Sequence, residues 1–526
     1  MAGTGAGMRK FALLGTPLPE GHDTPKGSTT PKRSCPLLPA STADTHPSES
    51  PICVKMENGG SVNLLPTNKT VGDKDLESPT EYRPRVYKRR WVMLAIFCAY
   101  SFSNAYQWIH LNIIADIMLR YYNQSLPSTQ YEAEVAVDWL SMIYMLAYIP
   151  LILPATWLLD KKGLRVSSII ATLLNCLGAW LKCLSVTPDR FPVLMLAQTI
   201  CAIAQLFVLG IPPRLAAVWF GLDEVSTATS IGVFGNQVGV AVGFLIPPEI
   251  VPNSEDLGKV GRDLRIMMYS TAGVTTALFI LVLLFFKEQP PRPPSRAQQL
   301  AVQSLANTNY IQSLKNLLRH RGFIILVFAY GFNTGSFYAV STLLNTLVLN
   351  YFPAQGQDAG RIGLTIVVAG VLGAIVAGIW LDKTRTYKAT TLSIYIMSCA
   401  GMAAFTFTMD LDRIWVVYIT AGTLGFFMTG YLPVGFEFAA EITYPEPEGT
   451  SSGLLNASAQ FWGIVLTLGM RAMITKVDVL YANIAMTAAL FIGVILTALI
   501  RSKYRRQEAE KEAQKVDIEI IDEEDS

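Results

Sequence analysis

Long apolar runs alternate with short polar stretches between residues 91 and 500. An α-helix needs about 20 apolar residues to cross the core of a bilayer. The runs therefore predict twelve spans: 91–118, 137–159, 167–187, 192–219, 229–251, 266–286, 323–350, 361–381, 390–409, 414–440, 452–474 and 480–500. Six spans precede a polar, proline-rich linker and six follow it, which predicts an all-α membrane protein built from two six-helix bundles.

The flanking segments complete the predicted domain organisation. Residues 1–88 are rich in Pro, Gly, Ser and Thr and are expected to be a disordered cytoplasmic region. The bundles are expected at 89–286 and 323–500, with a cytoplasmic linker at 287–322 and a charged cytoplasmic tail at 501–526. Basic residues gather at 88–90, 161–165 and 383–388, which an even number of crossings places on one side. The positive-inside rule predicts that this side, with both termini, is cytoplasmic.

Composition excludes several classes of protein. Of the 526 residues, 51% are hydrophobic and 16% are charged, against roughly 25% charged in soluble domains, so a soluble enzyme is excluded. The net charge of +2 and the lack of a basic face argue against a nucleic-acid partner. The seven cysteines form no CxxC pair and there are four histidines, so we expect no metal, no cofactor and no catalytic centre.

A repeat relates the two predicted bundles. The loop after the second span contains Asp160 and Arg165, and the loop after the eighth contains Asp382 and Lys383. The two aspartates are 222 positions apart, and similar segments in spans 5 and 11 show nearly the same offset. These loops resemble the signature loop between helices 2 and 3 of the major facilitator superfamily. We interpret the four residues as a cytoplasmic latch, in two pseudo-symmetric bundles that rock around a midplane site.

Polar and aromatic residues inside apolar spans mark a candidate pathway. These residues are Asn104 and Trp108 in span 1, Gln205 in span 4, Tyr338 in span 7 and Gln460 in span 11. Acids inside the spans are scarce, which favours facilitated transport. Aromatic faces attract a quaternary ammonium by about 0.5–2 kcal/mol per contact without a carboxylate. Trp108 and Tyr338 are therefore a candidate cation cage, and ordinary packing is the alternative interpretation.

Longer motifs carry a resemblance to a known family. They are NAYQWI (104–109), DWLSM (138–142), NCLGAW (175–180), EVSTA (224–228), GRIGLT (360–365), GFFMTGYLP (425–433) and SGLLNASAQ (452–460). With them, residues from about 89 to 506 closely resemble the feline leukaemia virus subgroup C receptor family, a branch of the major facilitator superfamily. His110, where the family usually has glutamine, and the loop between spans 1 and 2 depart from the pattern.

The resemblance implies a plasma-membrane carrier of choline and ethanolamine, with the endoplasmic reticulum and mitochondrial membranes as alternatives. It implies that Trp108 and Tyr338 hold the trimethylammonium group and that Gln205 and Gln460 line the same cavity. It also leaves haem, which family members were earlier described as moving, as the alternative substrate. Haem iron is usually held by His, Cys, Met or Tyr, and His110 is the one histidine in the predicted spans.

Three further expectations concern partners and modification. A receptor or sensor role for the termini competes with transport. Membrane lipid surrounds the spans, and we expect a monomer, as is frequent in this superfamily. Asn123 opens an N-glycosylation sequon in the loop between spans 1 and 2, on the predicted outer side.

Overall fold

The computed structural model describes residues 86–221, 224–292, 310–353, 355–446, 448–501 and 504–508. The expectations for 1–85, for most of the linker and for the tail beyond residue 508 lie outside the described residues. Within the described ranges the regular elements are helices and no strand occurs. The predicted all-α architecture is therefore confirmed.

The N-terminal half contains the helices before the linker. They are α1 (Arg89–Ile109), η1 (Asn112–Ile114), α2 (Ala115–Tyr121), α3 (Gln130–Leu184), α4 (Phe191–Trp219), α5 (Val225–Ile250) and α6 (Leu257–Phe285). The C-terminal half contains α8 (Tyr310–Arg319), α9 (Arg321–Tyr351), α10 (Gly356–Thr384), α11 (Tyr387–Thr408), η3 (Met409–Leu411), α12 (Ile414–Thr443), α13 (Glu448–Lys476) and α14 (Val479–Leu499).

Helix α3 combines two of the predicted spans. It contains the two candidate spans Gln130–Leu159 and Lys161–Leu184, and its one non-helical residue is Gly163, near the start of the second. Gly163 has a φ of +80°, a left-handed conformation that glycine adopts without steric cost. The helical path is therefore interrupted at this residue, in the loop that the sequence predicts between the second and third spans.

Eleven helical segments among the described residues are long and apolar enough to cross a membrane, compared with the twelve spans predicted. The missing one is α1, whose apolar character is diluted by Arg89 and Arg90 at its start and by polar residues such as Asn104 and Gln107. The prediction of one continuous span over 91–118 is wrong, because α1 ends at Ile109 and the chain continues as η1 and α2. The side-chain amide of Asn112 in η1 donates a hydrogen bond to the carbonyl of Val137 and so holds the segment after α1 against α3.

Part of the predicted linker is helical. Helix α8 covers Tyr310–Arg319 and packs against α9 and α13. Its apolar residues fall on one face, which is why Leu317 is buried while Lys315 on the other face is exposed. The linker was predicted as a polar, proline-rich segment because of its composition, and this short amphipathic helix was not identified from the sequence.

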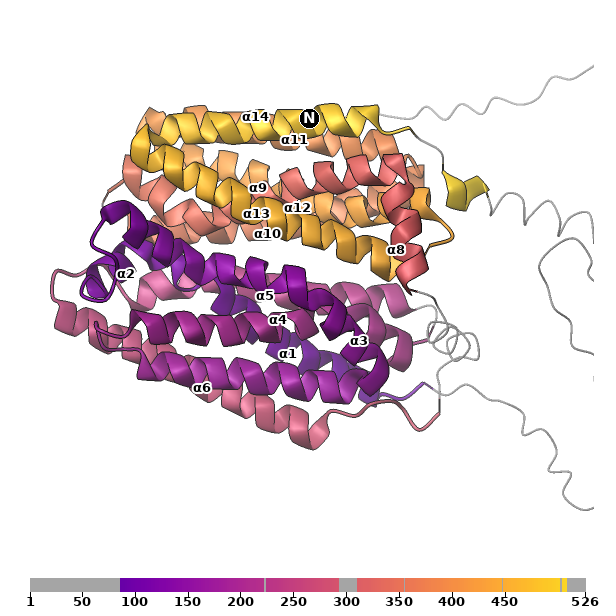
Figure 1. Cartoon of the computed structure of the whole chain (residues 1–526), viewed down its shortest axis with the longest axis horizontal. Coiled ribbons are helices and arrows are strands. Elements are labelled where there is room, and N and C mark those ends of the chain that lie inside the picture. The colour runs from indigo at the N-terminus through magenta and orange to yellow at the C-terminus, as the bar shows by residue number, and fades with distance from the viewer. Residues whose placement is uncertain are drawn as a thin grey trace, which may run out of the picture. The chain divides into compact units, whose positions relative to one another are not determined.

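The two halves meet along two helix pairs. Helix α3 packs against α13, and α5 packs against α10 (Figure 1). Gly360 and Gly363 of α10 lie against Phe244 of α5 so closely that a Cβ at either position would clash. We call the end of the bundle where α6 ends and α9 begins the linker end, and the opposite end the far end.

Candidate substrate pathway between the two halves

Trp108 and Tyr338 are in contact across the two halves. Trp108 on α1 is 6% exposed, and its ring centroid lies 5.7 Å from that of Tyr338 on α9, edge to face at 78°. Gly463 of α13 packs beside this pair, where a Cβ would approach the Tyr338 ring to 3.2 Å and the sulfur of Met145 to 2.9 Å. The structure thus brings the two predicted cage residues together, one from each half.

The two predicted glutamines lie on helices of this junction. Gln460 on α13 is 5% exposed, and its side chain interacts with the Tyr338 hydroxyl. Gln205 on α4 is half-buried, and its neighbour Leu206 packs in a cluster with Ala457, one turn before Gln460. Both amides are therefore placed near the seam between the halves.

Asn104 belongs to a buried hydrogen-bond network behind the aromatic pair. Its Nδ2 donates to the Asn175 Oδ1 at 3.0 Å and to the carbonyl of Cys201 at 3.1 Å. Its Oδ1 has no partner among the described residues. The direct substrate contact predicted for Asn104 therefore stays a prediction, beside a structural role that the hydrogen bonds show.

Lys182 supplies a buried charge that the sequence reasoning missed. It is 1% exposed, and its ammonium donates to the Gln107 Oε1 at 2.9 Å. Gln107 in turn donates to the Asn175 Oδ1 at 2.9 Å, and Gln198 donates to the backbone carbonyl of Gln107 at 3.1 Å. These bonds hold Gln107, the residue before Trp108 on α1, against α3 and α4. The available signal was a lysine inside the predicted span 167–187, which is uncommon unless it has a role.

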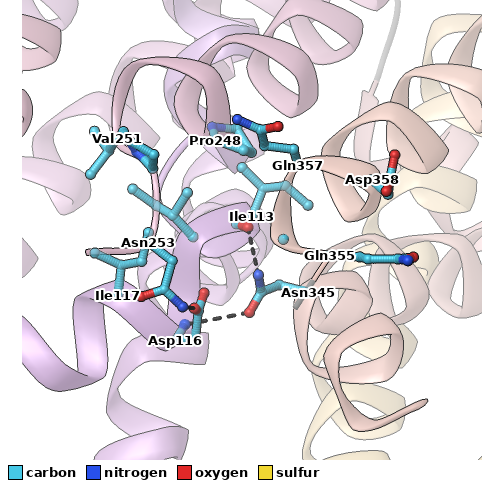
Figure 2. Close-up of a pocket in the computed structure, with 13 residues that line it drawn as sticks. Ile113, Asp116, Ile117, Pro248, Val251, Asn253, Asn345, Gln355, Gln357 and Asp358 are labelled. Atoms are coloured by element: carbon cyan, nitrogen blue, oxygen red, sulfur yellow. Dashed lines mark hydrogen bonds between the residues drawn. The ribbon is translucent and has the colours of Figure 1, made fainter. Parts of the chain in front are cut away.

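A cavity of about 260 Å³ lies between the halves at the far end (Figure 2). Its wall includes carboxylates from both halves, Asp116 after η1 and Asp358 at the start of α10. The Asp116 Oδ2 accepts from Asn253 at 3.4 Å, and the Asp116 backbone N–H donates to the Asn345 Oδ1 at 3.4 Å. Carboxylate and amide oxygens on this wall favour a cation. Sequence reasoning did not select these residues, although Asp116 and Asn345 lie within the predicted spans 91–118 and 323–350.

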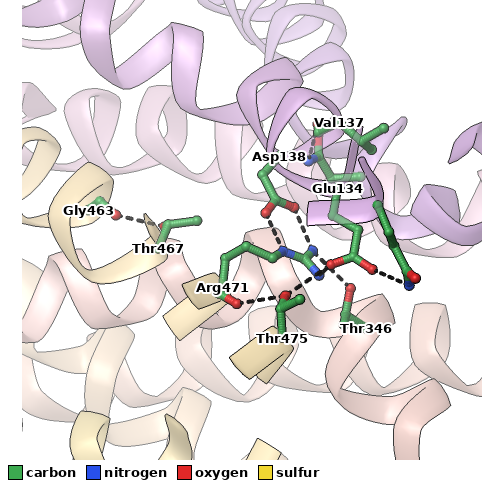
Figure 3. Close-up of polar contacts among 10 residues, drawn as sticks. Glu134, Val137, Asp138, Thr346, Gly463, Thr467, Arg471 and Thr475 are labelled. Atoms are coloured by element: carbon green, nitrogen blue, oxygen red, sulfur yellow. Dashed lines mark hydrogen bonds and ion pairs between the residues drawn. The ribbon is translucent and has the colours of Figure 1, made fainter. Parts of the chain in front are cut away.

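A buried ion pair joins the halves close to this cavity (Figure 3). Arg471 of α13 is 2% exposed and donates from Nε and Nη2 to the Asp138 carboxylate of α3 at 2.6 and 2.8 Å. Glu134 approaches the Arg471 guanidinium at 3.4 Å, and Thr346 of α9 accepts from it at 3.1 Å. The sequence contained a signal for this pair, because Asp138 and Arg471 are charges of opposite sign within the predicted spans 137–159 and 452–474. Neither residue was selected from the sequence.

Other polar contacts join the halves at the same end. The hydroxyls of Ser141 and Thr342 lie 3.0 Å apart, and Asn345 donates to the carbonyl of Ile113 at 2.8 Å. Arg361 of α10 and Glu249 of α5 form an exposed ion pair at 3.0 Å. The far end is therefore closed in this structure by contacts between the halves.

The linker-end loops contain the residues of the predicted latch. The side chains of Asp160 and Asp382 lie outside the described residues, and Lys383 is exposed. Glu288, just after α6, accepts from the backbone N–H groups of Leu164 and Arg165 at 2.8 and 2.7 Å. This carboxylate caps the second segment of α3, and a Cβ at Gly163 would clash with it. The latch role of Asp160 and Asp382 stays a prediction, while Glu288 is an acid that sequence reasoning missed.

Asn123 is exposed between α2 and α3. The hydroxyl of Ser125, the third residue of its sequon, donates to the carbonyl of Pro188 at 2.7 Å. Asn123 is therefore accessible to modification, and its glycosylation stays a prediction.

Comparison with known sequences gives one family and close relatives. Residues 92–468 match the Major Facilitator Superfamily. The chain is 54% identical over 434 residues to the choline/ethanolamine transporter flvcr2b of Danio rerio, covering 82% of this chain and 88% of that protein. It is 51% identical over 429 residues to the choline/ethanolamine transporter FLVCR2 of Homo sapiens, covering 81% and 80% respectively. With FLVCR1 of Felis catus the identity is 49%, covering 84% and 78%.

Solved structures match the fold at low sequence identity. A D-xylose–proton symporter superposes with a TM-score of 0.61 at 13% identity, covering 79% of this chain and 98% of that chain. A bacterial homologue of the human lysosomal transporter Spinster superposes with a TM-score of 0.59, also at 13% identity and with the same coverage. Such distant likenesses concern the arrangement of the helices alone.

Proposed function

Because this chain belongs to the Major Facilitator Superfamily and, within it, to the family of the FLVCR choline/ethanolamine transporters, we propose that it carries choline and ethanolamine across the plasma membrane by alternating-access uniport. Its relatives are membrane transporters and not enzymes. The observation that carries the substrate assignment is the contact between Trp108 and Tyr338 across the two halves.

The aromatic pair suits a quaternary ammonium. A trimethylammonium group has no N–H to donate, so its charge is best met by the negative face of an aromatic ring. Trp108 belongs to one half and Tyr338 to the other. Both rings can therefore contact one cation only when the two halves are close together at this point. Binding is thereby linked to the relative position of the halves, which is the requirement for alternating access.

The amides provide for the other end of the substrate. Gln460 interacts with the Tyr338 hydroxyl, and Leu206, the neighbour of Gln205 on α4, packs in a cluster with Ala457 of α13. Carboxamides both donate and accept hydrogen bonds, so they suit the hydroxyl of choline and the primary ammonium of ethanolamine. None of the four proposed contact residues is an acid, which favours movement down the gradient of the cation.

The far-end contacts define the state of the carrier. We assign the linker end to the cytoplasm, since Arg89, Lys161 and Lys383 lie there. The far end then faces outside and is closed by the ion pair of Arg471 with Asp138. Opening toward the outside requires this pair to part and its charges to be rehydrated in the widened cavity near Asp116. The carrier is proposed to work as a monomer within membrane lipid.

Haem transport remains the alternative substrate assignment, and no observation on the described residues favours it. His110 is buried and stacked on Tyr106 at 5.1 Å, and its Nδ1 is bonded to the carbonyl of Gln107. This histidine therefore packs inside the N-terminal half.

Uptake of radiolabelled choline into cells expressing the chain tests the proposal. Trp108→Ala and Tyr338→Ala should each reduce uptake about tenfold or more at matched surface levels, because each removes one face of the cage. Trp157→Ala is the matched control, since Trp157 is exposed on α3. Saturable uptake that survives both cage substitutions would refute the cage, and absence of choline and ethanolamine uptake by a well-expressed wild type would refute the substrate assignment.

A further inference from the structure

A second cavity lies at the linker end of the N-terminal half, away from the proposed pathway. It has a volume of about 390 Å³ and is enclosed by the start of α1, the end of α4 and the segment that follows α6. The side chains that matter chemically are those of Arg89, Trp219, Lys287 and Gln289. Pro290 and Pro291 complete the wall with apolar surface.

Three of the polar side chains of this wall, those of Arg89, Lys287 and Trp219, can only donate hydrogen bonds. Lys287 has no ion-pair or hydrogen-bond partner for its ammonium among the described residues, and Arg89 uses one guanidinium N–H on the carbonyl of Phe285 at 3.2 Å. Trp219 is 2% exposed, and its indole N–H has no acceptor within the described part of the chain. A buried N–H without an acceptor is costly, so native proteins rarely leave one without a partner, water or ligand.

Two nearby acids among the described residues are engaged elsewhere. Glu288 follows Lys287 directly, but its carboxylate oxygens accept from the backbone of Leu164 and Arg165 on α3. Glu224 is paired with Arg90 at 2.9 Å. Helix α1 also begins at Arg89 without an acid in its first turn, so its positive N-terminal end adds to the charge at the cavity.

We propose that this cavity binds a phosphate anion, with Lys287 and Arg89 as its charged donors and Trp219 as a neutral donor. The headgroup of an anionic phospholipid and free inorganic phosphate share this chemistry. Basic pockets at the cytoplasmic ends of membrane helices suit lipid headgroups, and the two prolines and the Trp219 ring offer apolar surface to a glycerol backbone. The anion would link the start of α1 to the segment after α6. The backbone N–H of Lys287 in this segment already donates to the sulfur of Met93 on α1 at 3.4 Å.

Ligand-induced thermal stabilisation of the purified full-length chain tests this site. The two probes are dioctanoyl phosphatidic acid and inorganic phosphate, each titrated against the wild type and the double variant Arg89→Gln/Lys287→Gln. Loss of charged donors should weaken binding about tenfold. Lys162→Gln is the matched control, because Lys162 is an equally exposed lysine at the same end and does not line the cavity.

The two probes separate the sources of the phosphate. Saturable stabilisation by the lipid alone assigns the site to a headgroup, and equal stabilisation by inorganic phosphate assigns it to the free anion. Trp219→Phe keeps an aromatic ring but removes the N–H, and it should weaken binding by a smaller factor. Unchanged affinity in the double variant, or an equal loss in Lys162→Gln, would overturn the proposal. Because the readout is binding, the result does not depend on choline transport.

Discussion

Both helices that carry the proposed cage residues are closely packed, but the buried polar side chains beside Trp108 are bonded to one another, whereas several on the helix of Tyr338 have no partner among the described residues. Behind Trp108, the side chains of Lys182, Gln107 and Asn175 are bonded to one another. Near Tyr338, Gly331 and Gly335 allow α9 to approach α13 closely. The difference indicates that the N-terminal half presents its ring from a fixed position.

The C-terminal half also contains polar atoms that have no partner. Tyr330, Asn333 and Thr334 on α9 are fully buried, and their side-chain polar atoms lack hydrogen-bond partners among the described residues. Unsatisfied buried groups cost about 1–3 kcal/mol each. A rearrangement of α9 that pairs them recovers this energy, so we expect α9 to move more than α1 during transport.

The ion pair at the junction of the halves should have the largest effect on stability. Arg471→Ala leaves Asp138 buried without its partner, which costs about 3–5 kcal/mol. The thermal unfolding temperature of the purified protein should fall sharply. Arg361→Ala, which breaks the exposed pair with Glu249, is the control and should cost at most about 1 kcal/mol. Similar losses for the two variants would contradict the gating role of the buried pair.

Two asparagine substitutions test the contrast between the halves. Asn175→Leu removes the acceptor of Gln107 and should cost about 1–3 kcal/mol. Asn333→Leu removes an amide that has no partner and should leave the unfolding temperature unchanged or raised. The test compares the thermal unfolding temperatures of the two variants with that of the wild type at matched protein concentration. A larger loss for Asn333→Leu would show that its amide is bonded in the native protein.

The linker-end loops provide a smaller contrast. Gly163→Ala places a side chain at a φ of +80° against Glu288 and should destabilise by about 1–2 kcal/mol. At the corresponding loop of the C-terminal half, Arg385 has a φ of +50°, so Arg385→Gly should be neutral or stabilising. Opposite signs are expected in chemical denaturation, and a neutral Gly163→Ala would argue against the Glu288 cap.

His320 should give the smallest effect, as a dependence of stability on pH. Its Nδ1 accepts from the Phe323 N–H at the start of α9, and desolvation, with a smaller contribution from Arg505, lowers the His320 pKa. The folded state thus prefers neutral histidine, so stability is present above about pH 6.5 and falls as the pH drops through the lowered pKa. His320→Asn keeps a capping group and should flatten this part of the pH profile. An unchanged profile would exclude His320 as its source.

Sequence periodicity was sufficient for most of the fold, because apolar length alone determines a membrane span. It placed a loop between the second and third spans, where Gly163 turns the chain. It could not show that the first span breaks after Ile109, since that break depends on local contacts. The polar-aromatic clusters within the spans and the family resemblance selected Trp108 and Tyr338, which lie in contact in the structure, while their role as a cation cage stays a prediction. Lys182 was missed because its significance depends on a partner, Gln107, that lies on another helix.

The proposed mechanism requires that a positive charge is held between Trp108 and Tyr338. The most direct test is competition for radiolabelled choline uptake between unlabelled choline and 3,3-dimethylbutan-1-ol, in which carbon replaces the charged nitrogen. A cation–π cage predicts that the neutral isostere competes at least about tenfold more weakly, in keeping with about 2 kcal/mol for a desolvated contact. Equal competition by the two compounds would mean that the site recognises shape alone, and would contradict the account.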